Sequence, residues 1–337
     1  MPERQQDQPG LVVGVDGGNT KTIAIVATAA GEIVGAGRAG CADIYNAPDE
    51  ATALREIEQA VESALTAAGA TRDDLAAGAF SIAGADWPED INLLQNAVDR
   101  LGFGRTTRIF NDAIGALRAG PPDGIGVSIT CGTGVAIGAR AASGETWYSG
   151  NWAIGFGGGE LGREALQAVF EAHLGLAPAT ALTPAVLAAM DVETVEEVLY
   201  RITARGATWN APDQARLAPM LLDQAAAGDS VACGIVTRAG MRNADVAMVA
   251  ARAVGLGDGP FRLVLNGGVL RHPSLLLERA IRQRIERIAP GVEIISDPPE
   301  PVIGAILLAL DVPGAIDEES VRARLRDTMP GPELFAT

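Results

Sequence analysis

The residues best suited to chemistry form a loop near the N-terminus, where Asp16 is followed by Gly-Gly-Asn-Thr-Lys-Thr. The glycines let the backbone approach an anion closely. Hydrogen-bond donors for that anion would be main-chain N–H groups, the hydroxyls of Thr20 and Thr22 and the Lys21 ammonium. A carboxylate beside phosphates implies a divalent cation between them, so Asp16 indicates Mg²⁺. An ordinary Asp-Gly-Gly hairpin turn is the alternative. The predicted phosphate-binding residues are Asp16, Gly17, Gly18, Asn19, Thr20, Lys21 and Thr22.

Lys21 is also unusual in the composition of the chain. Of the 26 basic residues, 25 are arginine and Lys21 is the single lysine. A compact ammonium charge suits a phosphate group, and chance retention is the alternative explanation. Lys21 is not preceded by a glycine and does not open a helix, so the loop lacks the Walker spacing and a P-loop nucleotidase is disfavoured.

A second turn, residues 130–134 with the sequence Thr-Cys-Gly-Thr-Gly, repeats this design in the other half of the chain. It also joins two short apolar segments, 124–129 and 135–140, that read as strands. Two such turns on opposed domains would bind a triphosphate in the cleft between them. We therefore predict that Gly132, Thr133 and Gly134 contact the nucleotide.

Asp112 follows Asn111 at the end of a predicted strand, 106–110, and precedes a predicted helix, 113–119. Ligands of open α/β sheets bind at the carboxyl ends of strands, so Asp112 is well placed to accept a proton from a substrate hydroxyl. Capping of the helix is the alternative role, because Asn and Asp are frequent N-caps.

The elements that must position these residues alternate between strand and helix, which is typical of a partly parallel sheet with helices on its faces. The second half repeats the strand, turn and strand of the first and then adds long helices. Helices of the second half are expected at 159–173, 183–204, 213–227, 230–254, 273–288 and 302–310. Pro121, Pro122 and Gly124 indicate a domain boundary.

We therefore predict an α/β protein of two related domains. The N-terminal domain is expected at 10–119, and the C-terminal domain, which carries a helical insert, at 120–312. A polar helix within the tail, 313–337, is expected to pack back on the first domain.

Composition limits the class of protein. A chain of 337 residues with 48% hydrophobic content can bury two cores, and its net charge of −16 opposes binding to nucleic acid or to an anionic membrane. Its apolar runs are too short to span a bilayer and its N-terminus is not signal-like, so we expect a cytoplasmic protein. Three cysteines without short spacing and only two histidines leave little for disulfides or histidine-rich metal sites.

Seven motifs in order resemble the BadF/BadG/BcrA/BcrD ATPase family of the actin/hexokinase/Hsp70 superfamily, and within it the N-acetylglucosamine kinases. The motifs are DGGNTKT at 16–22, SIAGADWPED at 81–90, FNDAIGA at 110–116, TCGTG at 130–134, GREAL at 162–166, LNGG at 265–268 and PVIGA at 301–305. The resemblance implies two ribonuclease-H-like, actin-like ATPase domains around a central nucleotide cleft. It also implies ATP and Mg²⁺ as cofactors and an amino sugar as substrate.

The resemblance also implies roles for single residues. Asp16 would organise the magnesium nucleotide, and Asp112 would act as general base on the sugar, expected at its 6-hydroxyl. Gly267 and Gly268 would lie against the adenosine. The residues expected at the sugar are Asp43, Asn111, Trp152 and Glu160. We also expect a homodimer.

The chain departs from the family pattern after Trp152, where the family usually reads GDEGS and residues 155–160 read Gly-Phe-Gly-Gly-Gly-Glu. The family's aspartate is missing there, and Asp43 stands where the family usually has a sugar-binding asparagine. Asp43 and Glu160 could favour a free ammonium over an acetamide, so both glucosamine and N-acetylglucosamine remain candidate substrates.

Three other functional classes are alternatives to a kinase. An ATP-driven activator of a dehydratase or reductase, from the same family, requires paired cysteines for a shared iron–sulfur cluster, and Cys41, Cys131 and Cys233 are widely spaced. A sugar-responsive repressor needs a helix-turn-helix, and only about ten residues precede the first strand. A sugar-binding ATPase without kinase activity is a further alternative.

Overall fold

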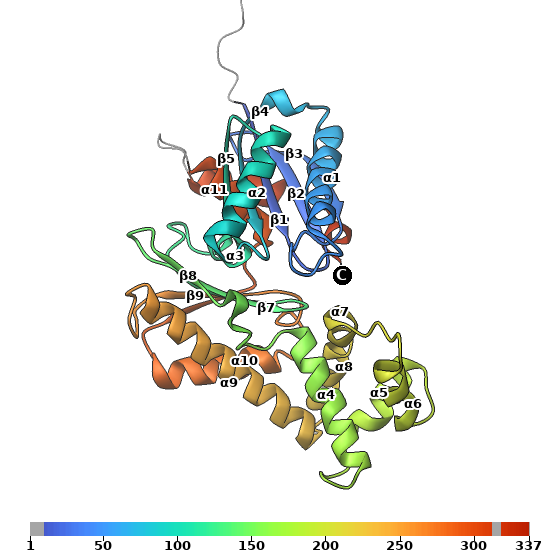
Figure 1. Ribbon diagram of the computed structural model, residues 1–337. Helices are drawn as coiled ribbons and strands as arrows, with labels where there is room; N and C mark the ends of the chain where they lie inside the picture. Colours follow the sequence, from blue (N-terminus) through green and yellow to red (C-terminus); the bar gives the residue numbers. More distant parts are fainter. Residues whose placement is uncertain (1–9, 312–317, 337) are drawn as a thin grey trace, which may run out of the picture. The chain divides into compact units, whose positions relative to one another are not determined.

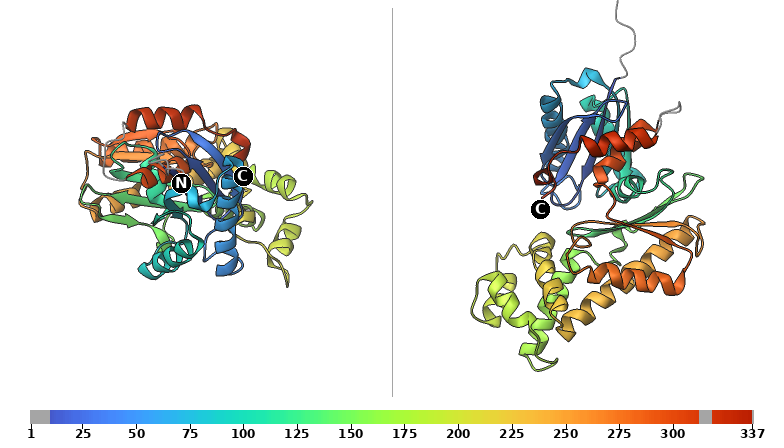
Figure 2. Two further views of the ribbon diagram at one scale, coloured as in Figure 1. Left: turned by 90° about the horizontal axis from the view of Figure 1, so that it is seen from above. Right: turned by 180° about the vertical axis from the view of Figure 1, so that it is seen from behind.

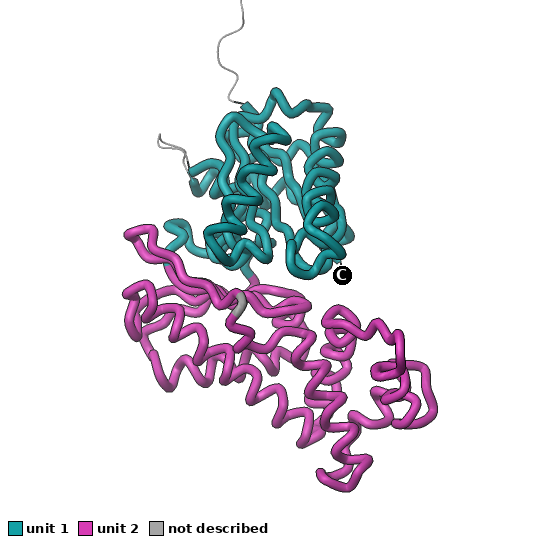
Figure 3. The backbone as a smooth tube through the Cα atoms, in the orientation of Figure 1, with its two compact units in different colours: residues 1–125, 298–337 teal, residues 126–297 magenta. Residues whose placement is uncertain are grey.

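The computed structural model describes residues 10–311 and 318–336, except for the side chain of Asn151. The chain divides into two compact units, coloured separately in Figure 3. Unit 1 takes the residues up to Ile125 and those from Pro298 onward, whereas unit 2 is the continuous segment Gly126–Asp297. Unit 2 is thus inserted into the sequence of unit 1.

Unit 1 contains a five-stranded sheet in the order β3-β2-β1-β4-β5. The strands are β1 (Leu11–Gly17), β2 (Thr22–Ala27), β3 (Ile33–Ala39), β4 (Leu75–Ile82) and β5 (Thr106–Asn111). The first three strands are antiparallel, and β4 and β5 run parallel to β1. The carboxyl ends of β1, β4 and β5 therefore lie at the same edge of the sheet, where Asp16 and Asn111 stand.

Helices cover both faces of this sheet (Figures 1 and 2). On one face, Val13 and Val15 of β1 pack with α1 (Glu50–Ala68) and α2 (Pro88–Leu101). On the other face, Val12 of β1 packs with α3 (Asp112–Ala119), α11 (Pro301–Leu310) and α12 (Glu318–Asp327). The alternation along β1 is expected for a strand, whose successive side chains point to opposite faces.

The domain boundary predicted at residue 312 is wrong for α11, which the sequence assigned to the second domain. A Cβ on Gly304 of α11 would lie 1.8 Å from the carbonyl oxygen of Gly115 in α3, so the two helices pack backbone against backbone. Ile306 and Leu307 of α11 are buried on the sheet of unit 1. An apolar helix buries its surface wherever a complementary face is available, and sequence order does not determine which face that is.

The tail helix α12 also belongs to unit 1. Val321 and Leu325 are buried against the same face as α11. The buried Arg118 of α3 forms ion pairs with Asp311 at 3.0 Å and with Glu318 at 2.7 Å. Residues 312–317 of the predicted tail lie outside the described part of the chain.

Unit 2 contains a second five-stranded sheet in the order β10-β9-β6-β7-β8. Its strands are β6 (Gly126–Cys131), β7 (Val135–Arg140), β8 (Thr146–Tyr148), β9 (Arg262–Asn266) and β10 (Glu293–Ser296). Strands β6 to β8 are antiparallel, and β9 and β10 run parallel to β6. Read in chain order, this is the topology of the first sheet, which confirms the internal repeat.

The helices of unit 2 are α4 (Gly158–His173), α5 (Leu182–Met190), α6 (Val195–Thr203), α7 (Ala211–Ala215), α8 (Ala218–Ala226), α9 (Ser230–Ala253) and α10 (Leu276–Ile288). Two of the helices predicted in unit 2 are each split into two, and α4 begins one residue earlier than predicted. The single helix expected at 183–204 is broken at Asp191, which has a left-handed φ of 51°. The helix expected at 213–227 is also two helices, and β8 was not predicted because it has only three residues.

Glycines of β3 serve packing rather than binding. A Cβ on Gly35 or Gly37 would lie 2.1 Å from a carbonyl oxygen of α1, so both glycines permit close contact between strand and helix. Within residues 10–311 and 318–336, no helix is both long enough and apolar enough to cross a membrane.

Candidate active site

The loop after β1 is a tight hairpin. Gly17 pairs with Thr22 across the two strands, and Gly18 N–H donates to the carbonyl of Lys21 at 2.9 Å. The carbonyls of Gly17 and Gly18 accept from Ala83 at 2.7 Å and Ala42 at 3.1 Å. Two carbonyl oxygens therefore point into the protein, which is favourable for a loop that must present donors rather than acceptors to an anion.

The structure gives Thr22 a different role from the predicted one. Its side chain is fully buried in β2, and its hydroxyl donates to the carbonyl of Gly40 at 2.7 Å. It therefore stabilises the loop instead of offering its hydroxyl proton to a phosphate. Thr20 is exposed at the tip of the hairpin, and the Lys21 ammonium donates to the carbonyl of Phe335 in the C-terminal segment.

The sequence left two roles open for Asp112, proton acceptor and helix cap, and the structure assigns the cap to Asn111. The side chain of Asn111 is the N-cap of α3, accepting from Ala113 N–H at 3.0 Å, and its amide donates to Asp86 at 2.8 Å. Since both ends of the amide are used within the protein, Asn111 positions the start of α3, and its contact with the sugar stays a prediction. Asp112 is the first helical residue and is not the N-cap, although its carboxylate also interacts with the backbone N–H of Ala113.

Burial and like charges raise the pKa values of carboxyl groups at this edge. The pKa of Asp16 is raised to about 7, chiefly by burial and then by the charge of Glu300, with Lys21 acting in the opposite direction. The pKa of Asp112 is also raised to about 7, by burial and by the charges of Asp16 and Asp86. Two carboxyl groups poised near neutral pH are typical of a proton-transfer site or a cation site.

Asp43 lies in the segment between β3 and α1. It is 5% exposed and accepts from Tyr45 N–H and from the Asn46 amide, both at 2.8 Å. Its charge, after burial, helps to raise the pKa of Asp86 to about 6, together with Asp90. This part of unit 1 is therefore strongly acidic.

The turn between β6 and β7 is also a tight hairpin, one residue shorter than the first loop. Cys131 pairs with Val135, and Gly132 N–H donates to the carbonyl of Gly134 at 2.9 Å. The carbonyls of Gly132 and Thr133 each accept at 2.8 Å, from Gly158 and Gly159 at the start of α4. Cys131 O accepts from Val269 at 3.1 Å. Four consecutive carbonyls of this turn are thus bonded within the protein, which leaves none of them to repel a phosphate.

Gly267 and Gly268 follow β9 and lie beside this turn. Gly267 has φ of +102°, and a Cβ there would lie 2.3 Å from Cys131 O, so the protein itself requires this glycine. A Cβ on Gly268 or on Gly132 would meet no atom within 4 Å. The absence of side chains at these two positions therefore leaves open space, as a site for a nucleotide requires.

Two buried oxygen atoms among the described residues have no hydrogen-bond partner, Oδ1 of Asn19 and Oγ1 of Thr130, one beside each turn. Buried polar atoms without a partner are rare, and a bound nucleotide could supply the donors that these two oxygens lack. In the described part of the chain, no three His, Cys, Asp or Glu side chains converge as a metal cage. Mg²⁺ usually binds through one or two carboxylates and substrate phosphates, so Asp16 fits it without such a cage.

Trp152 lies before the loop that leads to α4, and Glu160 lies in the first turn of that helix. Trp152 ends a short 3₁₀ helix, Gly150–Trp152, and its side chain is 67% exposed. Glu160 accepts from Gly157 N–H at 2.8 Å and so closes the first turn of α4. The structure thus gives Glu160 a capping role in addition to the predicted role at the sugar.

Sequence reasoning missed three residues that organise the site. Ser81 accepts from Gly115 N–H at 3.0 Å and donates to Asn111 O at 3.2 Å, which fixes the start of α3. Asp86 holds the Asn111 amide, and Glu300 raises the pKa of Asp16 after burial. Ser81 and Asp86 lie in one of the quoted motifs, but no spacing rule indicated their partners.

Two α/β units of one topology, each with a glycine-rich turn after its first strand, define an actin-like ATPase fold of the kind found in sugar kinases. The chain belongs to the BadF/BadG/BcrA/BcrD ATPase family, whose model matches residues 13–309.

Relatives of known description support this assignment. An N-acetyl-D-glucosamine kinase of Dictyostelium discoideum is 26% identical over 316 residues, covering 89% of this chain and 98% of the relative. An N-acetylmuramic acid/N-acetylglucosamine kinase of Clostridium acetobutylicum is 24% identical over 302 residues, covering 88% and 97%.

Solved structures show the same fold. A provisional N-acetylglucosamine kinase from Chromobacterium violaceum has a TM-score of 0.66 at 22% identity, covering 89% of this chain and 99% of that one. A glucokinase of the ROK family from Streptomyces griseus, in complex with glucose and AMPPNP, has a TM-score of 0.57 at 20% identity, with the same coverage.

Proposed function

We propose that this protein is an ATP- and Mg²⁺-dependent kinase that phosphorylates the 6-hydroxyl of an amino sugar, N-acetylglucosamine or glucosamine. The observation that carries the proposal is Asp112, a carboxyl with a pKa raised to about 7 that is not used as a cap. Asp112 lies close enough to Asp16 for the two charges to interact, at the edge of the sheet where β1 and β5 end. The chain belongs to a family of ATPases.

In the proposed reaction, the Asp16 loop and the Gly132–Gly134 turn each contribute contacts to the nucleotide. Asp16 would hold Mg²⁺, which neutralises phosphate charge when bound. Asp112 accepts the proton of the attacking sugar hydroxyl during in-line transfer. Catalysis then depends mainly on positioning and on stabilisation of charge.

The choice of sugar rests on the region around Asp43. Carboxylates of Asp43, Asp86 and Asp90 act on one another there, and a free ammonium group would relieve their repulsion. This favours glucosamine, whereas the names of the relatives favour N-acetylglucosamine.

A coupled assay of ADP release with glucosamine, N-acetylglucosamine and N-acetylmuramic acid tests the proposal. We expect turnover on at least one amino sugar, with glucose a poor substrate. If none of the sugars stimulates ADP release above the rate with ATP alone, the kinase proposal is rejected. A strong preference for N-acetylglucosamine over glucosamine removes the ammonium argument and leaves the kinase.

The pH dependence of the reaction follows from Asp112. A general base must be ionised, so kcat/KM for the sugar should fall as pH drops below about 7, by roughly tenfold per pH unit. Bound Mg²⁺ lowers the pKa of nearby carboxyls, so the acid limb should shift to lower pH as Mg²⁺ saturates. A profile that is flat between pH 5 and 8 would contradict the assignment of the base.

The cysteines argue against the activator of the same family. Cys131 is fully buried, and burial raises the pKa of its thiol to about 12, so it does not supply the thiolate that an iron–sulfur cluster requires. The homodimer and the cytoplasmic location stay predictions, and sedimentation velocity measures the first of them.

A further inference from the structure

Asn243 is a polar residue in the centre of the apolar core of unit 2. It lies on α9, is 0% exposed and has Ala244 and Val246 of the same helix buried close to it in sequence. Burial of an amide costs free energy unless all its groups are hydrogen-bonded. The partners of this side chain therefore show what it contributes.

The amide of Asn243 binds the loop that precedes α4. Its oxygen accepts from Phe156 N–H at 2.7 Å, and its nitrogen donates to Phe156 O at 2.9 Å. One side chain thus satisfies both polar groups of a single loop residue, as a neighbouring strand would. Arg242 adds a bond to Ile154 O at 2.9 Å.

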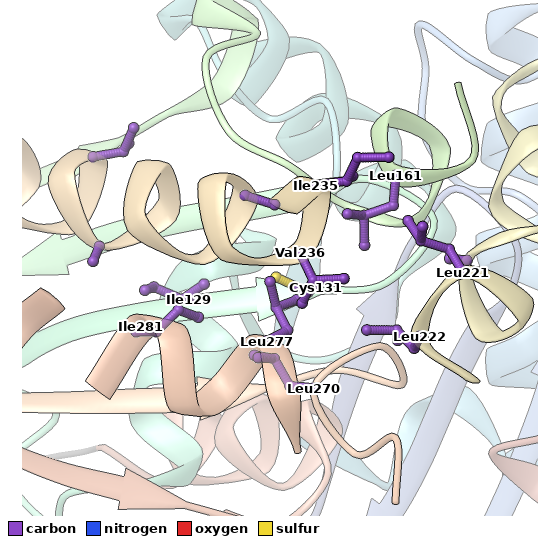
Figure 4. Packing of buried hydrophobic residues seen from close by; sticks show 14 of the residues in the cluster. Ile129, Cys131, Leu161, Leu221, Leu222, Ile235, Val236, Leu270, Leu277 and Ile281 are labelled. Carbon is purple, nitrogen blue, oxygen red and sulfur yellow. The ribbon is translucent and has the colours of Figure 1, made fainter. Parts of the chain in front are cut away.

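The same amide contacts the candidate nucleotide turn. Its nitrogen lies 3.5 Å from the sulfur of Cys131, and that thiol lies 3.7 Å from Phe156 O. Figure 4 shows Cys131 at the end of β6 among residues of α9 and α10. Asn243, Cys131 and Phe156 form one closed set of contacts between helix, turn and loop.

Glycines bring the loop into direct contact with the turn. A Cβ on Gly157 would lie 2.2 Å from the carbonyl carbon of Gly134, and one on Gly155 would lie 2.6 Å from Val135 Cγ1 and 3.2 Å from Asn243 Oδ1. With the bonds from Gly158 and Gly159 to the turn, the loop is held by hydrogen bonds at Ile154 and from Phe156 to Gly159. No residue other than glycine fits at these contacts without displacing the loop.

We propose that Asn243 is a positioning residue that fixes the 153–159 loop to the nucleotide turn. The loop, which follows the tryptophan expected at the sugar, and the turn, which is expected at the phosphates, are then held in a fixed relative position. This inference rests on the proposed kinase function.

The test compares Asn243→Ala with Val236→Ala, a change in the same helix that removes buried apolar volume but no hydrogen bond to the loop. Deuterium exchange of the amides at 154–159 should increase more than tenfold in Asn243→Ala and stay as in wild type in Val236→Ala. The KM for the sugar should rise about tenfold or more only in Asn243→Ala, with the Kd for ATP changed less than threefold.

A second variant covers the case in which Asn243→Ala does not fold. The Cβ of Gly155→Ala would collide with Val135 and crowd Asn243, which should displace the loop from both residues. Deuterium exchange in the loop and the KM for the sugar should then rise as in Asn243→Ala. If both variants match Val236→Ala in loop exchange and in KM, the inference is overturned. An inactive wild type would instead reject the proposed function, and loop exchange would still report whether Asn243 fixes the loop.

Discussion

Asp112→Asn is expected to lower kcat by roughly 10²- to 10⁴-fold, the usual contribution of a general base. Asparagine has nearly the same shape as aspartate but accepts no proton at neutral pH. The N-cap of α3 is Asn111, so the helix should keep its start. The Kd for ATP, measured by calorimetry, should change little, because the substitution acts on the acceptor side of the reaction.

The same variant should stabilise the protein in the absence of ligand. The folded pKa of Asp112, about 7, lies above its ordinary value of 3.8, so the folded state holds an extra proton between these values. Stability from this group is present at pH 4 and is lost as pH rises through 7. Asparagine does not ionise, so the variant avoids the cost of a buried charge that lowers the stability of wild type above pH 7. The Tm of Asp112→Asn should therefore exceed that of wild type at pH 8 and match it near pH 4.

These two measurements separate catalysis from folding. A variant that loses activity and also loses stability at pH 8 would indicate a structural role for Asp112. Near-normal turnover on the preferred sugar would reject Asp112 as the base.

Gly268→Ala and Gly132→Ala are expected to weaken ATP binding by roughly 10- to 100-fold. That range corresponds to an overpacking cost of about 1–3 kcal/mol when a methyl group enters filled space. Within the protein an added Cβ meets nothing within 4 Å at either position, so folding should be unaffected. Any loss of affinity must then come from contact with the ligand.

Two control variants separate contact with ATP from a general effect of replacing glycine by alanine. Gly234→Ala in α9, whose nearest neighbour would be Arg238 Nη1 at 3.5 Å, should leave both ATP affinity and Tm near wild type. Gly267→Ala should lower Tm, because its Cβ would overlap the backbone of Cys131. If Gly268→Ala and Gly132→Ala bind ATP as wild type does, the adenosine and phosphates lie elsewhere.

Local sequence patterns predicted those parts of the fold that depend on local chemistry. The two hairpins were predicted because small residues, among them Gly17, Gly18, Gly132 and Gly134, lie between short apolar segments. The repeat of topology followed from the similarity of these two patterns. The position of Asp112 after a strand was also correct. These features need only neighbouring residues to specify them.

Features that depend on distant partners could not be predicted in this way. The helix Pro301–Leu310 is apolar on nearly all sides, so no periodicity indicates which sheet it covers. Asn243 looks like a surface residue in a helix until Phe156 and Cys131 are seen beside it. The roles of Ser81 and Asp86 likewise arise from contacts with Gly115 and Asn111, which lie 25 to 34 residues away.

The insertion of one unit within the other has a consequence for synthesis on the ribosome. Unit 2 is a continuous segment and can complete its core as soon as Asp297 leaves the exit tunnel. Unit 1 cannot, because α11 and α12, which cover Val12, Ile23 and Ile25, are made after unit 2. Until then one apolar sheet face stays open to solvent, and we expect nascent chains that stop short of α11 to bind chaperones and to aggregate when released.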